Sequence, residues 1–288
     1  MILGMNLGIA DAFELGWKLA AVVNGHGRPA ILKSYEEERR PVAMMSIERS
    51  GVHMRVHMEA HKAIGGKVYA LDADTEEGHA LRQTIIKHYQ EHDGENTDYG
   101  IEMGYRYKSD IIIPDGTKEP KWTPSEYVPT TFPGSRAPHV FLRDGTAIFD
   151  LCGKDYTLVE FADETRADRG ANMLLDAAWR HRVPVKHIVL TSEEHAHAIW
   201  ERRLVLVRPD GHVAWRGDAV SDMETATDVF AAVSGEKTSS ASARANDEVV
   251  LSTDPSDVGE GAFAFTSTVT LDTQTTNFEL ERIGGFQS

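Results

Sequence analysis

The sequence predicts an α/β protein in which a mostly helical first part precedes a smaller region of mixed strands and helices. Apolar residues recur at helical spacing through most of the first part, whereas short apolar runs alternate with turn residues in 134–235. In that second region the expected order is strand, helix, strand, hairpin and helix. This order, over roughly one hundred residues, is sufficient for a small α/β domain.

Three helices are expected in the first part. A tight glycine turn leads into a helix over about Leu7–Val23, which carries apolar residues on two faces and should therefore be buried on two sides. The segment "NGHGRPA" ends it with glycines, and Pro29 begins the next helical stretch. That stretch extends through 31–62 and should kink near Pro41. A third helix is expected over about Thr75–His92, and "GENTDYG" closes the helical part.

The second part begins after an extended segment, "MGYRYKSDIIIPDG", and a proline-rich connector. A hairpin is expected at "HVFLRDGTAIFD", followed by a strand at Tyr156–Phe161, a helix near Ala171–Arg182 and a strand at Val185–Leu190. Two short strands flank the turn "RPDG". A last helix should begin with Ser221 as N-cap and Glu224 in the capping-box position.

These elements divide the chain into four regions. We expect a helical region at 1–110, a linker at 111–133, an α/β domain at 134–235 and a tail at 236–288. The tail carries three basic and nine acidic residues and is rich in small polar ones, so we expect it to be disordered. Within it, "AFAFTSTVTL" alternates in the manner of a strand.

Charge and cysteine content exclude several function classes. The formal net charge of -15 argues against a nucleic-acid partner and against a polybasic membrane anchor. No run of residues approaches the ~20 apolar residues that a membrane-spanning helix needs. Cys152 is the single cysteine, so a disulfide framework is excluded and a reducing, cytoplasmic location is expected.

The opening residues carry a family resemblance. The stretch "LGMNLGIADAFELGWKLAAVVNGHGRPAILKSYEEERRPVA" resembles the closing part of the FAD-binding domain of class A flavoprotein monooxygenases, the phenol and aromatic-ring hydroxylases. In that family a Gly-x-Asn-x-Gly-Ile-x-Asp-Ala turn leads into a helix ending in Trp-Lys-Leu-Ala, and a Ser-Tyr-x-x-Glu-Arg-Arg-Pro segment follows. The matching positions, in order, are Gly4, Asn6, Gly8, Ile9, Asp11, Ala12, Trp17, Lys18, Leu19, Ala20, Ser34, Tyr35, Glu38, Arg39, Arg40 and Pro41.

The resemblance implies that Gly4, Met5 and Asn6 contact the flavin near the pyrimidine end of its ring system. The physical chemistry of a helix start is compatible with this role, because unpaired N–H groups and the helix dipole favour a negatively charged group there. Gly4 would allow close approach of the backbone, and Asn6 offers both an amide donor and its own N–H.

The second half resembles the thioredoxin-like C-terminal domain of phenol-hydroxylase-type enzymes through "PGSRAPHVFLRDGTAIFDLCGKDYTLVEF" and "LVLVRPDGHVAWRGD". Where a working thioredoxin carries CxxC, this chain reads "ADETRADRGANML", so disulfide exchange is excluded and a packing or oligomerisation role is expected. The family's GxGxxG fingerprint has no counterpart here. The chain is therefore expected to be the C-terminal part of a longer enzyme.

The resemblance implies an FAD-dependent, NAD(P)H-using monooxygenase that hydroxylates a small phenolic or aromatic substrate through a flavin C4a-hydroperoxide. No catalytic residue is assigned, because the groups that orient the phenol belong to the upstream part. A non-catalytic dimerisation or interaction protein derived from such an enzyme is the alternative. The expected partners are a second copy of the chain or a complementing N-terminal half.

Other candidate sites have ordinary structural explanations. His53, His57 and His61 share one helical face and could hold a metal, but a solvated face or an interface is favoured, and no metal ligand is assigned. The run "EEERR", Glu36–Arg40, is expected to form partly solvated ion pairs, and Cys152 is expected to be a buried structural thiol. Four tryptophans are expected in the core or an interface, namely Trp17, Trp179, Trp200 and Trp215.

Overall fold

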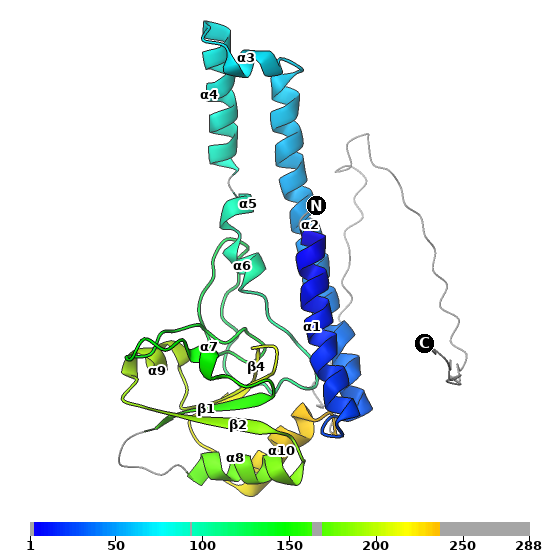
Figure 1. The fold of residues 1–288 in the computed structure, drawn as a ribbon, viewed down its shortest axis with the longest axis vertical. Helices are drawn as coiled ribbons and strands as arrows, with labels where there is room; N and C mark the ends of the chain where they lie inside the picture. The colour runs from blue at the N-terminus through cyan, green and yellow to red at the C-terminus, as the bar shows by residue number, and fades with distance from the viewer. Residues whose placement is uncertain (1–2, 93, 163–168, 237–288) are drawn as a thin grey trace, which may run out of the picture. The chain divides into compact units, whose positions relative to one another are not determined.

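The computed structural model describes residues 3–92, 94–162 and 169–236, and its first part is helical (Figure 1). The expected acidic tail, apart from its first residue, and the strand expected within it lie outside the described residues. None of the helices in the described ranges is long and apolar enough to cross a membrane. The helical elements in chain order are α1 (Leu3–Val23), the 3-10 helix η1 (Pro29–Leu32), α2 (Lys33–Ile64), α3 (Val68–Asp72), α4 (Glu76–Glu91), α5 (Gly94–Thr97) and α6 (Tyr99–Glu102).

The three long helices follow the sequence pattern closely. Pro29 opens η1, and Pro41 lies inside α2. Thr75 caps α4, because its hydroxyl accepts a hydrogen bond from the backbone N–H of Gly78. In Figure 1, α1 lies beside the first half of α2, and α3 links the far ends of α2 and α4. The segment expected to close the helical part instead forms the short helices α5 and α6.

Two expectations about α1 are wrong. The helix begins at Leu3, so Gly4–Asn6 form part of its first turn instead of a separate glycine turn before it. Only one face of α1 is buried, through Trp17 and its neighbours, whereas Ile9 is 62% and Phe13 58% exposed. Because η1, α2 and the sheet cover only the first face, the second apolar face remains open to solvent in the described structure.

The second part contains a four-stranded sheet whose strand order is β2-β1-β3-β4. β1 pairs with β2 in parallel and with β3 antiparallel, and β3 and β4 form a hairpin around the RPDG turn. A mixed sheet of this kind with helices on its faces makes the chain an α/β protein, as predicted. The elements are α7 (Ile148–Leu151), β1 (Tyr156–Ala162), α8 (Arg169–Arg180), β2 (Val185–Thr191), α9 (Glu194–Trp200), β3 (Leu204–Val207), β4 (Val213–Gly217) and α10 (Met223–Val233).

Side chains of the central strands alternate between two hydrophobic cores. Leu158 and Leu206 lie on the face covered by α8 and α10, where the core also includes Trp17 of α1. Val159 and Val205 point to the opposite face, where Trp200 of α9 packs. This alternation follows from the two-residue period of a strand, and it explains why β3 is apolar throughout and why most residues of β1 are apolar. The shared core joins α1 to the sheet.

Three local predictions in this part require correction. The N-cap of α10 is Asp222 and not Ser221, because Asp222 Oδ1 accepts the Thr225 N–H at 2.7 Å. The expected hairpin at "HVFLRDGTAIFD" is a single bridge between Phe141 and Ala147 that runs into α7. The helix α9 was not expected at all. Its histidine- and glutamate-rich sequence gives little apolar periodicity, and burial of Trp200 stabilises it instead.

Candidate functional site

The three residues predicted to contact flavin lie together at the start of α1. Gly4, Met5 and Asn6 are all exposed, and they occupy the first helical turn, where backbone N–H groups lack partners within the helix. A Cβ built on Gly4 would meet nothing within 4 Å, so the described chain leaves the space beside it open. These amides can therefore donate hydrogen bonds to an electron-rich group from outside the described residues, and the positive end of the helix dipole also favours such a group there.

A stripe of small residues runs along α1 from this start. Its five members recur every four residues, and all are exposed. The three glycines among them have no atom close to the position of a Cβ, although each glycine inside a helix costs about 1 kcal/mol relative to alanine. Such a face allows another backbone to approach closely. The members of this small-residue stripe are Gly4, Gly8, Ala12, Gly16 and Ala20.

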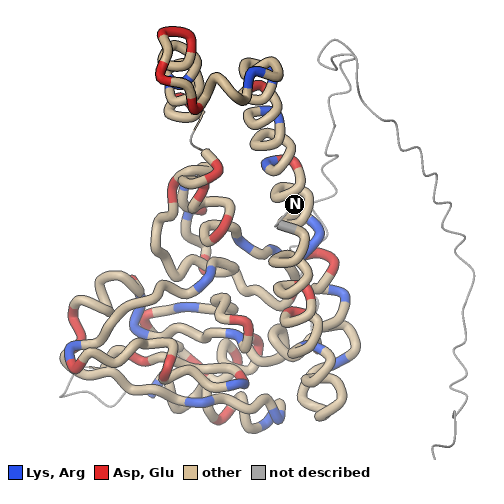
Figure 2. The backbone as a smooth tube through the Cα atoms, turned by 45° about the horizontal axis from the view of Figure 1, so that its top comes forward, with Lys and Arg blue, Asp and Glu red and all other residues tan. Residues whose placement is uncertain are grey.

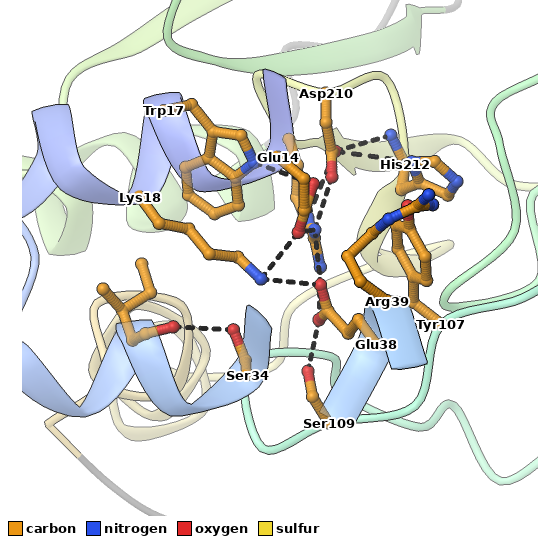
Figure 3. Close-up of polar contacts among 12 residues, drawn as sticks. Glu14, Trp17, Lys18, Ser34, Glu38, Arg39, Tyr107, Ser109, Asp210 and His212 are labelled. Atoms are coloured by element: carbon orange, nitrogen blue, oxygen red, sulfur yellow. Dashed lines mark hydrogen bonds and ion pairs between the residues drawn. The ribbon is translucent and has the colours of Figure 1, made fainter. Parts of the chain in front are cut away.

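On the opposite, buried face of α1 lies a cluster of charged side chains, which we call the buried charge cluster. It consists of Glu14 and Lys18 from α1, Glu38 from α2, and Arg208 and Asp210 from the RPDG turn between β3 and β4 (Figure 3). Each of these side chains is at most 4% exposed. The cluster therefore connects the helical part to the sheet through buried charges.

Arg208 is the centre of this cluster. Its Nη1 donates to Glu38 Oε1 at 2.7 Å, and its Nη2 donates to Glu38 Oε2 at 2.9 Å and to Glu14 Oε1 at 2.8 Å. Nε donates to Asp210 Oδ1 at 3.2 Å, and Nη2 also contacts the other Asp210 oxygen. One guanidinium thus contacts carboxyl groups from three segments of the chain, which its planar fork of donors is suited to do.

The cluster contains three carboxyl groups and two cationic side chains. Lys18 Nζ lies 2.6 Å from Glu14 Oε1 and 2.8 Å from Glu38 Oε2. Burial is the main cause that raises the pKa of Glu14 to about 9, and a hydrogen bond with the Asp210 carboxyl group acts in the same direction against the lowering effect of Arg208. Despite burial, Arg208 holds the pKa of Glu38 down to about 2 and that of Asp210 well below its usual range. The raised pKa of Glu14 favours its protonated form, whereas the lowered pKa values of Glu38 and Asp210 favour their ionised forms.

Aromatic and polar groups surround the cluster. The Arg208 guanidinium lies 5.0 Å from the Trp17 ring centroid and 5.4 Å from that of Tyr107. Trp17 Nε1 also donates to Glu14 Oε2 at 3.0 Å. Beside it, Arg39 donates from Nε to Asp11 Oδ1 at 2.7 Å and from Nη1 to the Tyr107 hydroxyl at 2.9 Å. This shell keeps water away from the charges and fixes α1 against α2.

Sequence reasoning missed this cluster. The run Glu36–Arg40 was expected to be partly solvated, which holds for the exposed pair Glu36 and Arg40 but is wrong for the buried Glu38 and Arg39. The RPDG segment was interpreted only as a turn. The available signal was weak: a Glu-Lys pair at i,i+4 on the helical face of Trp17 marks charges that share a buried side.

The remaining candidates are placed as follows. His53 Nε2 lies 3.0 Å from Asp98 Oδ2, and His57 contacts the Tyr89 hydroxyl at 3.1 Å and the carboxylate of Glu95. The described residues contain no group of three or more histidine, cysteine or acidic side chains able to hold a metal. Cys152 is a free, half-buried thiol whose pKa is raised by burial. Trp17, Trp200 and Trp215 are buried as expected, whereas Trp179 is 82% exposed.

Comparisons with known proteins match both parts of the chain. Residues 1–50 match the FAD binding domain family, and residues 130–236 match the aromatic-ring hydroxylase C-terminal family. The FAD-dependent monooxygenase apdD of Emericella nidulans is 42% identical over 236 residues, which cover 81% of this chain and 38% of the relative. Phenol 2-monooxygenase of a Pseudomonas strain is 28% identical over 266 residues, covering 81% of this chain and 42% of the relative.

Solved structures agree with these matches. The rebeccamycin biosynthetic enzyme RebC, solved with reduced flavin, superposes with a TM-score of 0.67 at 34% identity, over 81% of this chain and 42% of that enzyme. The chain thus spans about 40% of the length of the proteins it resembles. Its two matched segments are similar to the FAD-binding domain and to the C-terminal region of FAD-dependent aromatic-ring monooxygenases.

Proposed function

We propose that this chain is the C-terminal part of an FAD-dependent monooxygenase that hydroxylates a small phenolic or aromatic substrate, with NAD(P)H as reductant. One observation carries the proposal. The segment that matches the FAD binding domain family begins α1 with amides that have no partner within the helix, and an exposed stripe of small residues runs along the helix from there. A helix that only packed in a core of this chain would have no use for that open face.

Within this proposal, Gly4, Met5 and Asn6 hold the flavin. FAD held there would supply the redox chemistry, namely transfer of electrons from NAD(P)H and activation of oxygen for hydroxylation of the aromatic ring. The described residues contribute binding and orientation: Gly4 admits the ring system close to the backbone, and the first-turn amides stabilise negative charge on it.

The small-residue stripe and the apolar residues beside it form the surface on which the upstream part of a longer enzyme packs. Met5, Ile9 and Phe13 are each more than half exposed along this face. Glycine at Gly8 and Gly16 would let the partner backbone approach closely, which balances the helix propensity they lose. In the same proposal the buried charge cluster keeps α1 in a fixed position relative to the sheet.

We also propose that the sheet is a thioredoxin-like domain without redox function. The parallel β1–β2 pair and the antiparallel β3–β4 hairpin, with α8 and α10 against one face, support this assignment. The described part of the chain has no CxxC pair, because Cys152 is the single cysteine of the sequence. The domain would therefore act in packing or in association of subunits.

The test uses the full chain, alone and mixed with the separately expressed N-terminal part of a relative such as apdD. We expect flavin absorbance, FAD fluorescence quenching and NAD(P)H oxidation with a phenolic substrate only in the mixture. Gly4→Val and Asn6→Ala should weaken FAD binding there, whereas the remote exposed variant Lys87→Ala should not. Unchanged FAD affinity in both α1 variants would overturn the assignment of these residues.

The alternative, a non-catalytic interaction protein, is favoured by one feature outside the flavin-contacting face. Large apolar side chains lie exposed along α2, far from the start of α1 in sequence. A mixture that shows neither flavin binding nor NAD(P)H oxidation, from a chain that still self-associates, would favour this alternative.

A further inference from the structure

A cavity of about 330 Å³ lies between residues 37–45 of α2 and the segment that follows α6, residues 103–122. We call it the α2 cavity. Its volume is within the range of about 300–1,000 Å³ that is usual for pockets that bind small molecules. Of the described residues that line it, none belongs to α1, whose open face the proposed function assigns to the upstream part. The α2 cavity therefore needs an explanation of its own.

The walls of the α2 cavity are mainly apolar. The helix α2 contributes Pro41, Val42 and Met45, and the segment after α6 contributes the half-buried rings of Tyr105 and Trp122. Aromatic faces and a methionine sulfur both pack well against aromatic rings. This lining therefore favours a flat aromatic ligand, and the volume has room for a small fused-ring system.

The segment after α6 is held in place by its own hydrogen bonds. Arg106 Nη1 donates to the Pro120 carbonyl at 2.9 Å, and Trp122 Nε1 donates to the Gly100 carbonyl at 3.1 Å. A Cβ at Gly100 would collide with the Thr123 carbonyl, so the close approach of these two backbone segments requires glycine. The cavity wall is thus formed without a ligand, which lowers the entropy cost of binding.

The polar end of the α2 cavity carries paired charges. Glu119 Oε1 accepts a hydrogen bond from Arg106 Nη1 at 3.3 Å, and Glu119 Oε2 accepts one from Lys108 Nζ at 2.9 Å. Burial opposes the ionisation of Glu119, but the hydrogen bonds from Lys108 and Arg106 hold its pKa below the usual range. The carboxylate is therefore ionised at neutral pH and lies between two cations.

The acidic residues on the α2 side of the cavity are paired as well. Glu37 Oε1 lies 3.3 Å from Lys33 Nζ, and Glu38 is bound by Lys18 and Arg208 in the buried charge cluster. Both signs of charge occur on this half of α2 and on the segment after α6 (Figure 2). Within the described chain, a ligand with a full charge would thus lose hydration without gaining an unpaired counter-ion.

A hydroxyl group matches the polar end without adding charge. Each oxygen of Glu119 accepts one of the two hydrogen bonds above and can accept another, and Lys108 Nζ has further donors. A hydroxyl can therefore donate to Glu119 while it accepts from Lys108. We propose that the α2 cavity binds a neutral aromatic ring system that carries a hydroxyl group. The ligand class follows from the lining residues and requires no flavin, so failure of this proposal and failure of the proposed function can be told apart.

Methyl NMR of the full chain, with ¹³C-labelled methionine methyl groups, tests whether 2-naphthol occupies the cavity. The Met45 signal should shift on titration, whereas Met44, which is 58% exposed and does not line the cavity, should give an unchanged signal. Naphthalene, which lacks the hydroxyl, and the charged 2-naphthoate should each bind about threefold more weakly or less tightly still. Equal affinity for 2-naphthoate would overturn the proposal.

Substitutions test the location by calorimetric titration with 2-naphthol. Met45→Trp fills the cavity and should weaken binding at least about tenfold, whereas Met44→Trp, the same change at the exposed neighbour, should have no effect. Lys108→Met removes the donor at an exposed position and should weaken binding about threefold, with the exposed Lys121→Met as its control. Equal effects within either pair of variants would place the binding elsewhere and overturn the proposal.

The same NMR titration of the chain mixed with the N-terminal part of a relative shows whether a longer enzyme leaves the α2 cavity open. The Met45 signal should again respond to 2-naphthol. A Met45 signal that is shifted by the N-terminal part itself, and then does not respond to 2-naphthol, would show that the upstream part covers the cavity. That result, or a Met45 signal unaffected by 2-naphthol in both samples, would overturn the proposal.

Discussion

Replacing Arg208 by methionine tests whether the buried charge cluster holds the two parts of the chain together. Methionine keeps an unbranched, flexible side chain of similar reach but removes the guanidinium. The variant leaves Glu38 and Asp210 ionised with Lys18 as the nearest cation, and Lys18 contacts Glu38 but not Asp210 among its ion pairs. An uncompensated carboxylate would then remain fully buried.

The expected decrease in the free energy of unfolding is large for a single substitution. Removing one partner of a buried ion pair costs about 3–5 kcal/mol, because the charge that remains has lost both its counter-ion and its hydration. Arg208 makes hydrogen bonds to three carboxyl groups and also lies over Trp17, so we expect a value in the upper half of that range. Typical domains unfold with about 5–15 kcal/mol, so the variant should be close to the limit of stability.

Urea denaturation followed by tryptophan fluorescence measures the effect. The matched control is Arg28→Met, because the pair Arg28–Glu236 has side chains 61% and 30% exposed and should contribute no more than about 1 kcal/mol. The difference in unfolding free energy between the original chain and the Arg208→Met variant should shrink as the pH is lowered from about 8 to about 5. Buried carboxylates without a cation take up protons readily, and this removes the uncompensated charge. A loss equal to that of Arg28→Met, or one independent of pH, would refute the reasoning.

Three further predictions concern α1, the cluster and α10. Gly16→Ala should stabilise the isolated chain by about 1 kcal/mol in urea denaturation, because a Cβ there meets nothing, and a clear destabilisation would contradict the open face of α1. Glu14 has its pKa raised to about 9 in the folded state, so its contribution to stability is complete below an unfolded value of 4.5 and is lost as the pH rises through 9. Glu14→Gln should flatten this decline in a series of melting curves, and an unchanged slope would show that Glu14 carries no extra proton. Asp222→Ala should lower the thermal unfolding midpoint, whereas Ser221→Ala should lower it less, and the reverse order would restore Ser221 as the cap.

The sequence predicted those features that depend on neighbouring residues. Thr75 before α4, the glycines after α1 and the alternating β1 strand each act within a few residues, so their spacing identifies the element. The resemblance assigns flavin contact to the start of α1, and this assignment stays a prediction. The region boundaries at 110, 133 and 235 also stay predictions.

The buried charge cluster could not be predicted in the same way. Glu38 and Arg208 are 170 positions apart, and nothing in the local sequence of either indicates the other. In a helix, a run such as "EEERR" places successive charges on different faces, so its composition suggests solvent exposure even when one side is buried. Only the packing of α1 and α2 on the RPDG turn determines which of these charges are buried.

The cluster also has a consequence for modular exchange among related enzymes. Glu14, Lys18 and Glu38 lie in the segment that matches one family, and Arg208 and Asp210 lie in the segment that matches another. A chimera that took either segment alone from a relative with different charges at these positions would bury a mismatched set. Recombination between such enzymes therefore has to transfer both segments together, or first replace the whole set by apolar residues.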